Sequence, residues 1–194
     1  MAPYGAAPFR LERVPPGTEV VLASSLQPVN YPPEVIAARK LLAEMVKEDQ
    51  EARMAFDGVR MESADEKNRA VLLRIFEQYG WPKSSVIGTD AAHDFWLLVQ
   101  HQTPEIQQRW LPEMEKAAKS GEASKSDYAY LYDRVQVGLG KPQRWGSQVK
   151  CQDGEPVLAP VDDPAGLEER RKALFLLPVA EYLKNDYIVK SCTK

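Results

Sequence analysis

Residues 92–101 read Ala-His-Asp-Phe-Trp-Leu-Leu-Val-Gln-His, and this stretch decides the fold. A helix with this sequence is apolar on most sides, which is typical of a helix surrounded by other elements in the centre of a domain. Thr89 or Asp90 stands just before the stretch, where a helix cap is expected. The sequence therefore predicts a central helix with His93 in its first turn and His101 in its last.

The segments on either side repeat their apolar residues about every 3.6 positions, which is the period of an amphipathic helix. Their starts are predicted from prolines and capping side chains at Pro33, Ser63, Thr103, Ser124 and Asp163. Ser63 and Glu66 have the spacing of a capping box, in which the two side chains satisfy two free amides at a helix start. The helix from Asp163 is expected to continue through Leu177. We expect five or six helices in all.

Residues 141–161 differ from the helical segments, because Gly, Pro and Asp separate short apolar runs. Asp153-Gly154 suits a tight turn between two strands, so we expect a small β-hairpin there. A further short strand is predicted at Thr18–Ala23. The predicted fold class is therefore mainly α: a single helical domain over residues 33–194 with one small β element.

Residues 1–32 form a proline-rich N-terminal arm. Proline removes backbone donors and blocks helix interiors, so an irregular, extended course is expected. The apolar residues of the arm favour packing on the domain; a disordered leader is the alternative. The residues concerned are Phe9, Leu11, Val20, Val21, Leu22 and Tyr31.

Composition excludes several classes of protein. A net charge of −3 argues against a nucleic-acid-binding protein with a broad basic surface. No apolar run reaches the roughly 18–20 residues of a membrane span, and the first residues lack the apolar stretch of a signal peptide. Cys151 and Cys192 form no CxxC motif and no disulfide framework. We therefore expect a cytoplasmic protein in a reducing compartment.

The familiar signatures of cofactor and metal enzymes do not occur in the sequence. It contains no phosphate-binding glycine loop, no nucleophile elbow and no HExxH pattern. The two histidines stand far from either cysteine, and their spacing is not that of a metal site. The sequence thus predicts neither a metal ion nor an organic cofactor.

His93 and His101 are the candidate catalytic residues, because they stand at opposite ends of one predicted helix. The positive end of the helix dipole disfavours a charged imidazole at His93, whereas the negative end favours one at His101. Such a pair is suited to proton transfer, with one histidine as base and one as acid. The alternative is structural: His101 caps carbonyl groups and His93 fills a polar notch.

Two further regions supply candidate residues. In the run Tyr128–Arg134, Tyr132 is a candidate substrate contact, Asp133 a catalytic partner of a histidine and Arg134 the holder of an anionic group. The alternative for this run is an aromatic packing face closed by an ion pair. Polar side chains elsewhere complete the predicted substrate-binding set, unless they satisfy buried backbone instead: Gln100, Gln107, Glu122, Gln143 and Gln148.

Several short motifs follow one another in a fairly specific order. They are Asp49-Gln50, Arg53, Gly80-Trp81-Pro82, Ala92-His93, Gln100-His101, Gln107, Leu111-Pro112, Gly121-Glu122, Tyr130–Arg134, Gly140–Gln143, Gly146–Gln148 and Asp163-Pro164. In this order residues 41–182 resemble a family of small, mostly helical microbial proteins that is catalogued as a domain of unknown function. The resemblance implies no activity. It implies that the candidate polar residues coincide with the family's motif positions, while Trp145 and Ser147 stand where Tyr and Thr are expected.

The function expected from these residues is that of a metal-independent enzyme. It would act on a small polar substrate by histidine acid–base catalysis, in a hydrolysis, cyclisation or condensation, within a biosynthetic pathway. The alternative is a non-catalytic module that binds a small molecule or a peptide. Two histidines buried apart and bonded only to backbone would favour that alternative.

Overall fold

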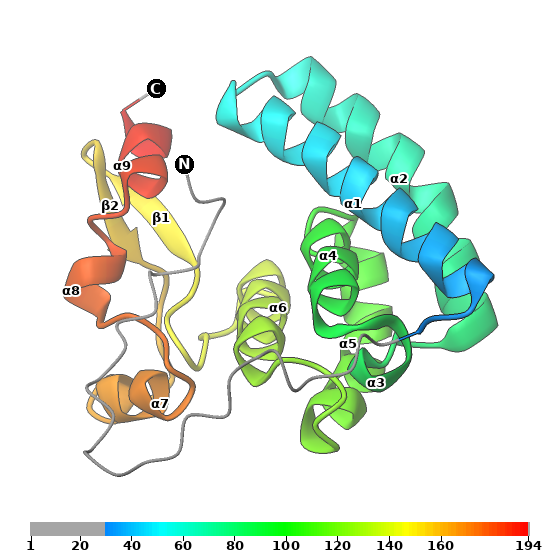
Figure 1. Cartoon of the computed structure of the whole chain (residues 1–194). Helices are drawn as coiled ribbons and strands as arrows, with labels where there is room; N and C mark the ends of the chain where they lie inside the picture. The colour runs from blue at the N-terminus through cyan, green and yellow to red at the C-terminus, as the bar shows by residue number, and fades with distance from the viewer. Residues whose placement is uncertain (1–29, 194) are drawn as a thin grey trace, which may run out of the picture.

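The computed structural model describes residues 30–193 and is mainly helical. The elements of this part of the chain are α1 (Pro33–Met54), α2 (Gly58–Tyr79), α3 (Ser84–Ile87), α4 (Thr89–Val99), α5 (Pro104–Lys119), α6 (Lys125–Gly138), β1 (Val149–Gln152), β2 (Glu155–Leu158), α7 (Leu167–Ala173), α8 (Val179–Tyr182) and α9 (Asp186–Cys192). Helices α1–α5 lie on one side of the molecule, the hairpin with α7–α9 lies on the other, and α6 stands between them (Figure 1).

Helix α4 is the centre of the larger side, as its apolar sequence predicts. It packs against α1, α2 and α3, and its residues from Phe95 to Val99 are all buried. Aromatic rings join it to the neighbouring helices: Trp110 of α5 stacks on Phe76 of α2 with ring centroids 4.2 Å apart, and its ring lies 5.9 Å from that of Phe95. The core is therefore built around the one helix that has apolar residues on most sides.

The described residues form nine helices, more than the five or six that the sequence predicts. Gly88, at a φ of 86°, separates the short α3 from α4. The predicted last helix stops at Ala173 and not at Leu177, because Phe175 takes a left-handed conformation with a φ of 55°. Two further short helices, α8 and α9, follow it.

The capping-box prediction at Ser63 and Glu66 is wrong. Helix α2 begins at Gly58, and its N-cap is Asp57, whose carboxylate accepts a hydrogen bond from the amide of Arg60 at 3.1 Å. A side chain can cap only where the backbone enters the helix. Ser63 stands one turn inside, so its hydroxyl has no free amide to satisfy.

The predicted β-hairpin is confirmed. Strands β1 and β2 pair antiparallel, with Gln152 opposite Glu155. Asp153 and Gly154 between them both have positive φ, 53° and 82°, as a primed turn requires. The predicted strand Thr18–Ala23 and residues 1–29 of the arm lie outside the described residues.

A disulfide joins Cys151 of β1 to Cys192 of α9. The expectation that the cysteines form no disulfide is therefore wrong. Spacing in the sequence says little about a single pair, since 41 positions separate the two residues and the packing of α9 on the hairpin brings them together. Among residues 30–193, none of the helices has the length and apolar character needed to cross a bilayer.

Candidate active site

The two histidines stand beside different aspartates, in two separate pockets. Nδ1 of His93 lies 2.9 Å from the carboxylate of Asp127, and Nδ1 of His101 lies 3.1 Å from that of Asp49. Neither histidine lines the pocket of the other. The structure thus forms two independent histidine–aspartate pairs and not the single shared site that one helix suggested.

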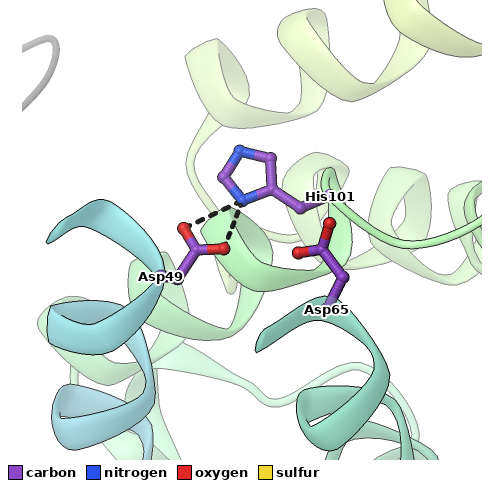
Figure 2. A group of neighbouring side chains, drawn as sticks. All are labelled: Asp49, Asp65 and His101. Atoms are coloured by element: carbon purple, nitrogen blue, oxygen red, sulfur yellow. Dashed lines mark hydrogen bonds and ion pairs between the residues drawn. The ribbon is translucent and has the colours of Figure 1, made fainter. Parts of the chain in front are cut away.

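The His101 site is assembled from three elements. Helix α1 presents Asp49 and, one turn later, Arg53; α2 presents Asp65; and His101 lies in the turn between α4 and α5. In Figure 2 one ring nitrogen of His101 faces both oxygens of Asp49, and Asp65 lies on the other side of the group. Packing of α1 and α2 against α4 therefore brings these side chains together.

Asp49 is the centre of this network. Its side chain is completely buried, and its carboxylate accepts hydrogen bonds from Nε2 of Gln50 at 2.7 Å and Nε of Arg53 at 3.1 Å. Burial alone would raise the pKa of Asp49. The bonds and charges of His101 and Arg53 outweigh burial and lower the pKa of Asp49 to about 2. The carboxylate is therefore ionised at neutral pH.

His101 is only 12% exposed, and burial lowers its pKa below 6.5 although Asp49 opposes the shift. The charges of Arg53 and Arg134 lower the pKa further. The imidazole is thus neutral near neutral pH. Because ionised Asp49 can only accept, the ring proton stands on Nδ1. Nε2 then carries a free lone pair, the state that a general base needs.

A polar pocket of about 440 Å³ opens beside His101. Its walls are formed by the first half of α2 and by the turn between α4 and α5. The lining residues are Glu62, Asp65, Glu66, Arg69, His101, Gln102 and Thr103. Burial raises the pKa of Asp65 despite the ion pair with Arg53, so this carboxyl group accepts a proton more readily than an exposed aspartate.

Asp49, Asp65 and His101 are also the residues that could hold a metal ion, since one ligand atom of each lies within 4.8 Å of the others. Arg53 bridges the two carboxylates, with Nη2 at 3.0 Å from Asp49 and 2.5 Å from Asp65. The guanidinium thus supplies the positive charge that a metal ion would bring. Metal binding here would require Arg53 to move away.

His93 stands at a second, more apolar cavity of about 280 Å³, between α3, α4 and the start of α6. Trp81 and Trp96 are among its lining residues, and the His93 side chain is 46% exposed. The hydrogen bond to Asp127 raises the pKa of His93 above 6.5, against the effect of burial. His93 therefore stays protonated to higher pH than an exposed histidine.

Asp133, which the sequence analysis named as a catalytic partner, reaches neither histidine. It is completely buried, and its two oxygens accept hydrogen bonds from the amides of Arg144, Trp145 and Ser147 at 2.7–3.1 Å. Both oxygens of the carboxylate thus bind backbone amides of one loop. Asp133 therefore anchors the loop after α6 and is part of neither histidine–aspartate pair.

Two of the predicted substrate-binding glutamines also hold backbone. Nε2 of Gln143 donates to the carbonyls of Gln148 and Ala159, and its Oε1 accepts from the amide of Gln148. Nε2 of Gln107 donates to the carbonyls of Gln100 and Gln102. The bonds of Gln143 fix the loop after α6, those of Gln107 fix the turn beside His101, and the side-chain NH₂ group of each glutamine binds two carbonyls.

The other predicted contacts are spread over the molecule. Gln100 is buried, and the Gln148 side chain donates to the hydroxyl of Ser147. Glu122 accepts hydrogen bonds from the amide and hydroxyl of Ser85 in α3. Tyr132 packs edge-on against Trp145. Arg134 alone of the predicted substrate contacts lies close enough to His101 for its charge to act on the imidazole.

The candidate site also includes residues for which no role was predicted from the sequence: Asp49, Arg53 and Asp65. Asp49 and Arg53 do carry a local signal, because residues four apart on a helix lie on one face and this pair has opposite charge. Asp49 and His101 are 52 positions apart in the sequence, so no local pattern indicates that they are in contact.

Comparison with known families confirms the resemblance found in the sequence. The model of DUF6624, described as a family of unknown function, matches residues 36–190. No curated protein and no solved structure matches the chain. The matched range contains both histidine–aspartate pairs.

Proposed function

The chain belongs to this family of unknown function, and from its own side chains we propose that it is an enzyme that acts on a small polar substrate by acid–base catalysis at His101. The observation that carries the proposal is the contact of Nδ1 of His101 with the buried, ionised Asp49 at 3.1 Å. A carboxylate in this position fixes the tautomer of a histidine and stabilises the imidazolium formed when Nε2 takes a proton.

The proton transfer can be followed atom by atom. Nε2 of neutral His101 removes a proton from an O–H or N–H group of the substrate, or from a water molecule, and the ring becomes positively charged. Asp49 stabilises that charge, and Arg53 keeps Asp49 in place from the next turn of α1. Return of the proton from Nε2 to a leaving group completes a hydrolysis, cyclisation or condensation. None of these steps uses a metal ion.

The polar lining of the 440 Å³ pocket supports a small hydrophilic substrate. Such a substrate would extend from the pocket past the imidazole to Nε2, which faces away from Asp65. A place in a biosynthetic pathway would be consistent with such chemistry and is part of the proposal. The expected cytoplasmic location is less well supported, because the bond between Cys151 and Cys192 is typical of oxidising compartments.

A second candidate function is ligand binding without chemistry. It is favoured by the 280 Å³ cavity at His93, whose tryptophan walls are typical of sites that hold an apolar group.

Turnover of a panel of small esters, lactones and amides, followed by NMR, tests the enzyme proposal. For any substrate found, His101→Gln should reduce kcat by roughly 10²–10⁴-fold with the melting temperature retained. His93→Gln is the matched control, because it removes the other histidine, and its kcat should change little. Equal turnover by His101→Gln and the wild type would overturn the proposal, and loss only in His93→Gln would move the chemistry to the second cavity.

A second measurement needs no substrate. Nitrogen NMR should show His101 neutral at neutral pH with the proton on Nδ1. A His101 that is protonated at neutral pH would contradict a role as base, because Nε2 would then have no free lone pair.

A further inference from the structure

Arg134 is a largely buried cation without a counter-ion in the part of the chain that the structure describes. Its Nε is inaccessible to water and has no hydrogen-bond partner there. Two other partly buried arginines do have partners: Arg53 pairs with Asp49 and Asp65, and Arg171 donates to three backbone carbonyls, although its Nη2 is left without one. Arg134 differs from both, because no hydrogen bond or ion pair joins it to another described residue.

A buried charge without a partner is unfavourable, because the protein replaces water by a medium of low dielectric constant. The ionisable groups that act on Arg134 are Arg53, Tyr182 and Tyr187, and no carboxylate is among them. Arg53 repels it. Burial accordingly lowers the pKa of Arg134. The residue is positioned to gain free energy from any anion that reaches it.

The position of Arg134 relates it to the His101 site. Its charge acts on the imidazole of His101, together with that of Arg53. In Figure 2 the second ring nitrogen of His101 points away from Asp49 and Asp65. The free nitrogen of the proposed base is therefore directed away from the acidic side of the site, and a cation without a partner lies within electrostatic reach of the ring.

We propose that Arg134 binds an oxyanion, a carboxylate or a phosphate group, beside His101. This inference rests on the proposed function, because it assigns the substrate of that site to the anionic class. A planar guanidinium can hold either group by two parallel hydrogen bonds, and such a clamp would orient the rest of the substrate.

The bound anion also has a consequence for the base. Its negative charge offsets the effect of Arg134 on His101 and favours the imidazolium. Binding of the anion and protonation of His101 should therefore promote each other, so that the site becomes a stronger base when the substrate is present.

The test is an NMR titration of the full chain with acetate and, separately, with inorganic phosphate, at constant ionic strength. We expect one of the two anions to raise the pKa of His101 in the wild type. Arg134→Gln should lower the affinity for that anion roughly tenfold or more, since a charge-assisted hydrogen bond is lost. Arg109→Gln removes an exposed arginine of α5 and is the control, with affinity unchanged. The anion that binds distinguishes a carboxylate substrate from a phosphate.

Arg134→Lys keeps the positive charge without the planar pair of donors. It should retain the fold and bind the anion more weakly than the wild type. The anion affinity can therefore still be measured if Arg134→Gln unfolds. Equal affinity in the wild type and both Arg134 variants, or no effect of either anion on His101, would overturn the proposal. His101→Gln should still bind the anion. Turnover retained by that variant would therefore refute the proposed function and leave the anion site standing.

Discussion

Nδ1 of His101 lies 3.1 Å from both carboxylate oxygens of Asp49. One residue comes from α1 and the other from the end of α4, so the contact exists only when the two helices are packed together. Asp49 is completely buried, and it retains its charge because His101 and Arg53 compensate for the water it has lost. The stability of the fold and the basicity of His101 therefore depend on the same carboxylate.

The pKa of Asp49 gives the pH dependence of this contribution. The folded-state pKa of about 2 is below the ordinary 3.8, so the stabilisation is complete above about pH 4 and is lost as the pH falls toward 2. Asp49→Asn should remove this acid-side slope from the free energy of unfolding, measured with urea at several pH values. It should also cost about 3–5 kcal/mol, as expected when one partner of a buried ion pair is removed. If the curves of unfolding free energy against pH were parallel for the variant and the wild type, the lowered pKa of Asp49 would be contradicted.

The two histidines should have opposite effects on stability as the pH changes. The pKa of His93 is raised above 6.5, so its contribution is complete below pH 6.5 and is lost as the pH rises through the folded-state pKa. The pKa of His101 is lowered, so protonation of the unfolded chain destabilises the fold as the pH falls below 6.5. His93→Gln and His101→Gln should therefore change the slope of unfolding free energy against pH in opposite directions. If both variants changed this slope in the same direction, the opposite pKa shifts of the two histidines would be contradicted.

The secondary structure is largely predictable because its signals are local. The apolar run from Phe95 to Val99 marks the central helix, and Asp153-Gly154 marks the hairpin. The start of α2 shows the limit of such signals. Ser63 and Glu66 have the right spacing for a cap, but Asp57 has already capped the helix, and only the backbone course distinguishes the two.

The candidate site is less predictable, because packing and not local pattern creates it. His93 lies in α4 and His101 in the turn after it, yet each is paired by a different neighbour: Asp127 from α6 and Asp49 from α1. The distance of Asp133 from both histidine pairs was not predictable for a related reason. Its position in a polar run gives no sign that a loop 11–14 residues later folds back onto its carboxylate.

Asp133→Asn tests the role of that carboxylate as a loop anchor. An asparagine offers one acceptor oxygen where the aspartate offers two, and its amide would meet backbone N–H groups. We expect a loss of about 2–4 kcal/mol in unfolding free energy, since each unsatisfied buried donor costs about 1–3 kcal/mol. Amide exchange should become faster at Trp145 and Ser147.

The matched control is Asp153→Asn, an exposed turn position at a φ of 53°, which asparagine tolerates well. Its stability should be close to that of the wild type. An Asp133→Asn protein of unchanged stability but reduced turnover would instead support the catalytic role predicted for Asp133.

Arg53 should determine whether the site binds a metal ion. In the wild type its guanidinium lies between Asp49 and Asp65, so we expect neither EDTA nor Zn²⁺ to change the melting temperature. Arg53→Ala removes the guanidinium and leaves two carboxylates and an imidazole within 4.8 Å of one another. This variant should gain a Zn²⁺-dependent increase in melting temperature. Stabilisation of the wild type by Zn²⁺ would instead show that Arg53 yields its place to the metal.

The disulfide between Cys151 and Cys192 should stabilise the C-terminal part of the chain. It closes a loop across 41 positions and joins β1 to α9, which in the chain-entropy account contributes about 4 kcal/mol by restricting the unfolded state. A reducing agent should therefore lower the melting temperature of the wild type. The double variant Cys151→Ser/Cys192→Ser should melt at that lower temperature with or without the reducing agent. Two free thiols in untreated protein, detected by thiol titration under denaturing conditions, would show that the bond does not form and would support the cytoplasmic location expected from the sequence.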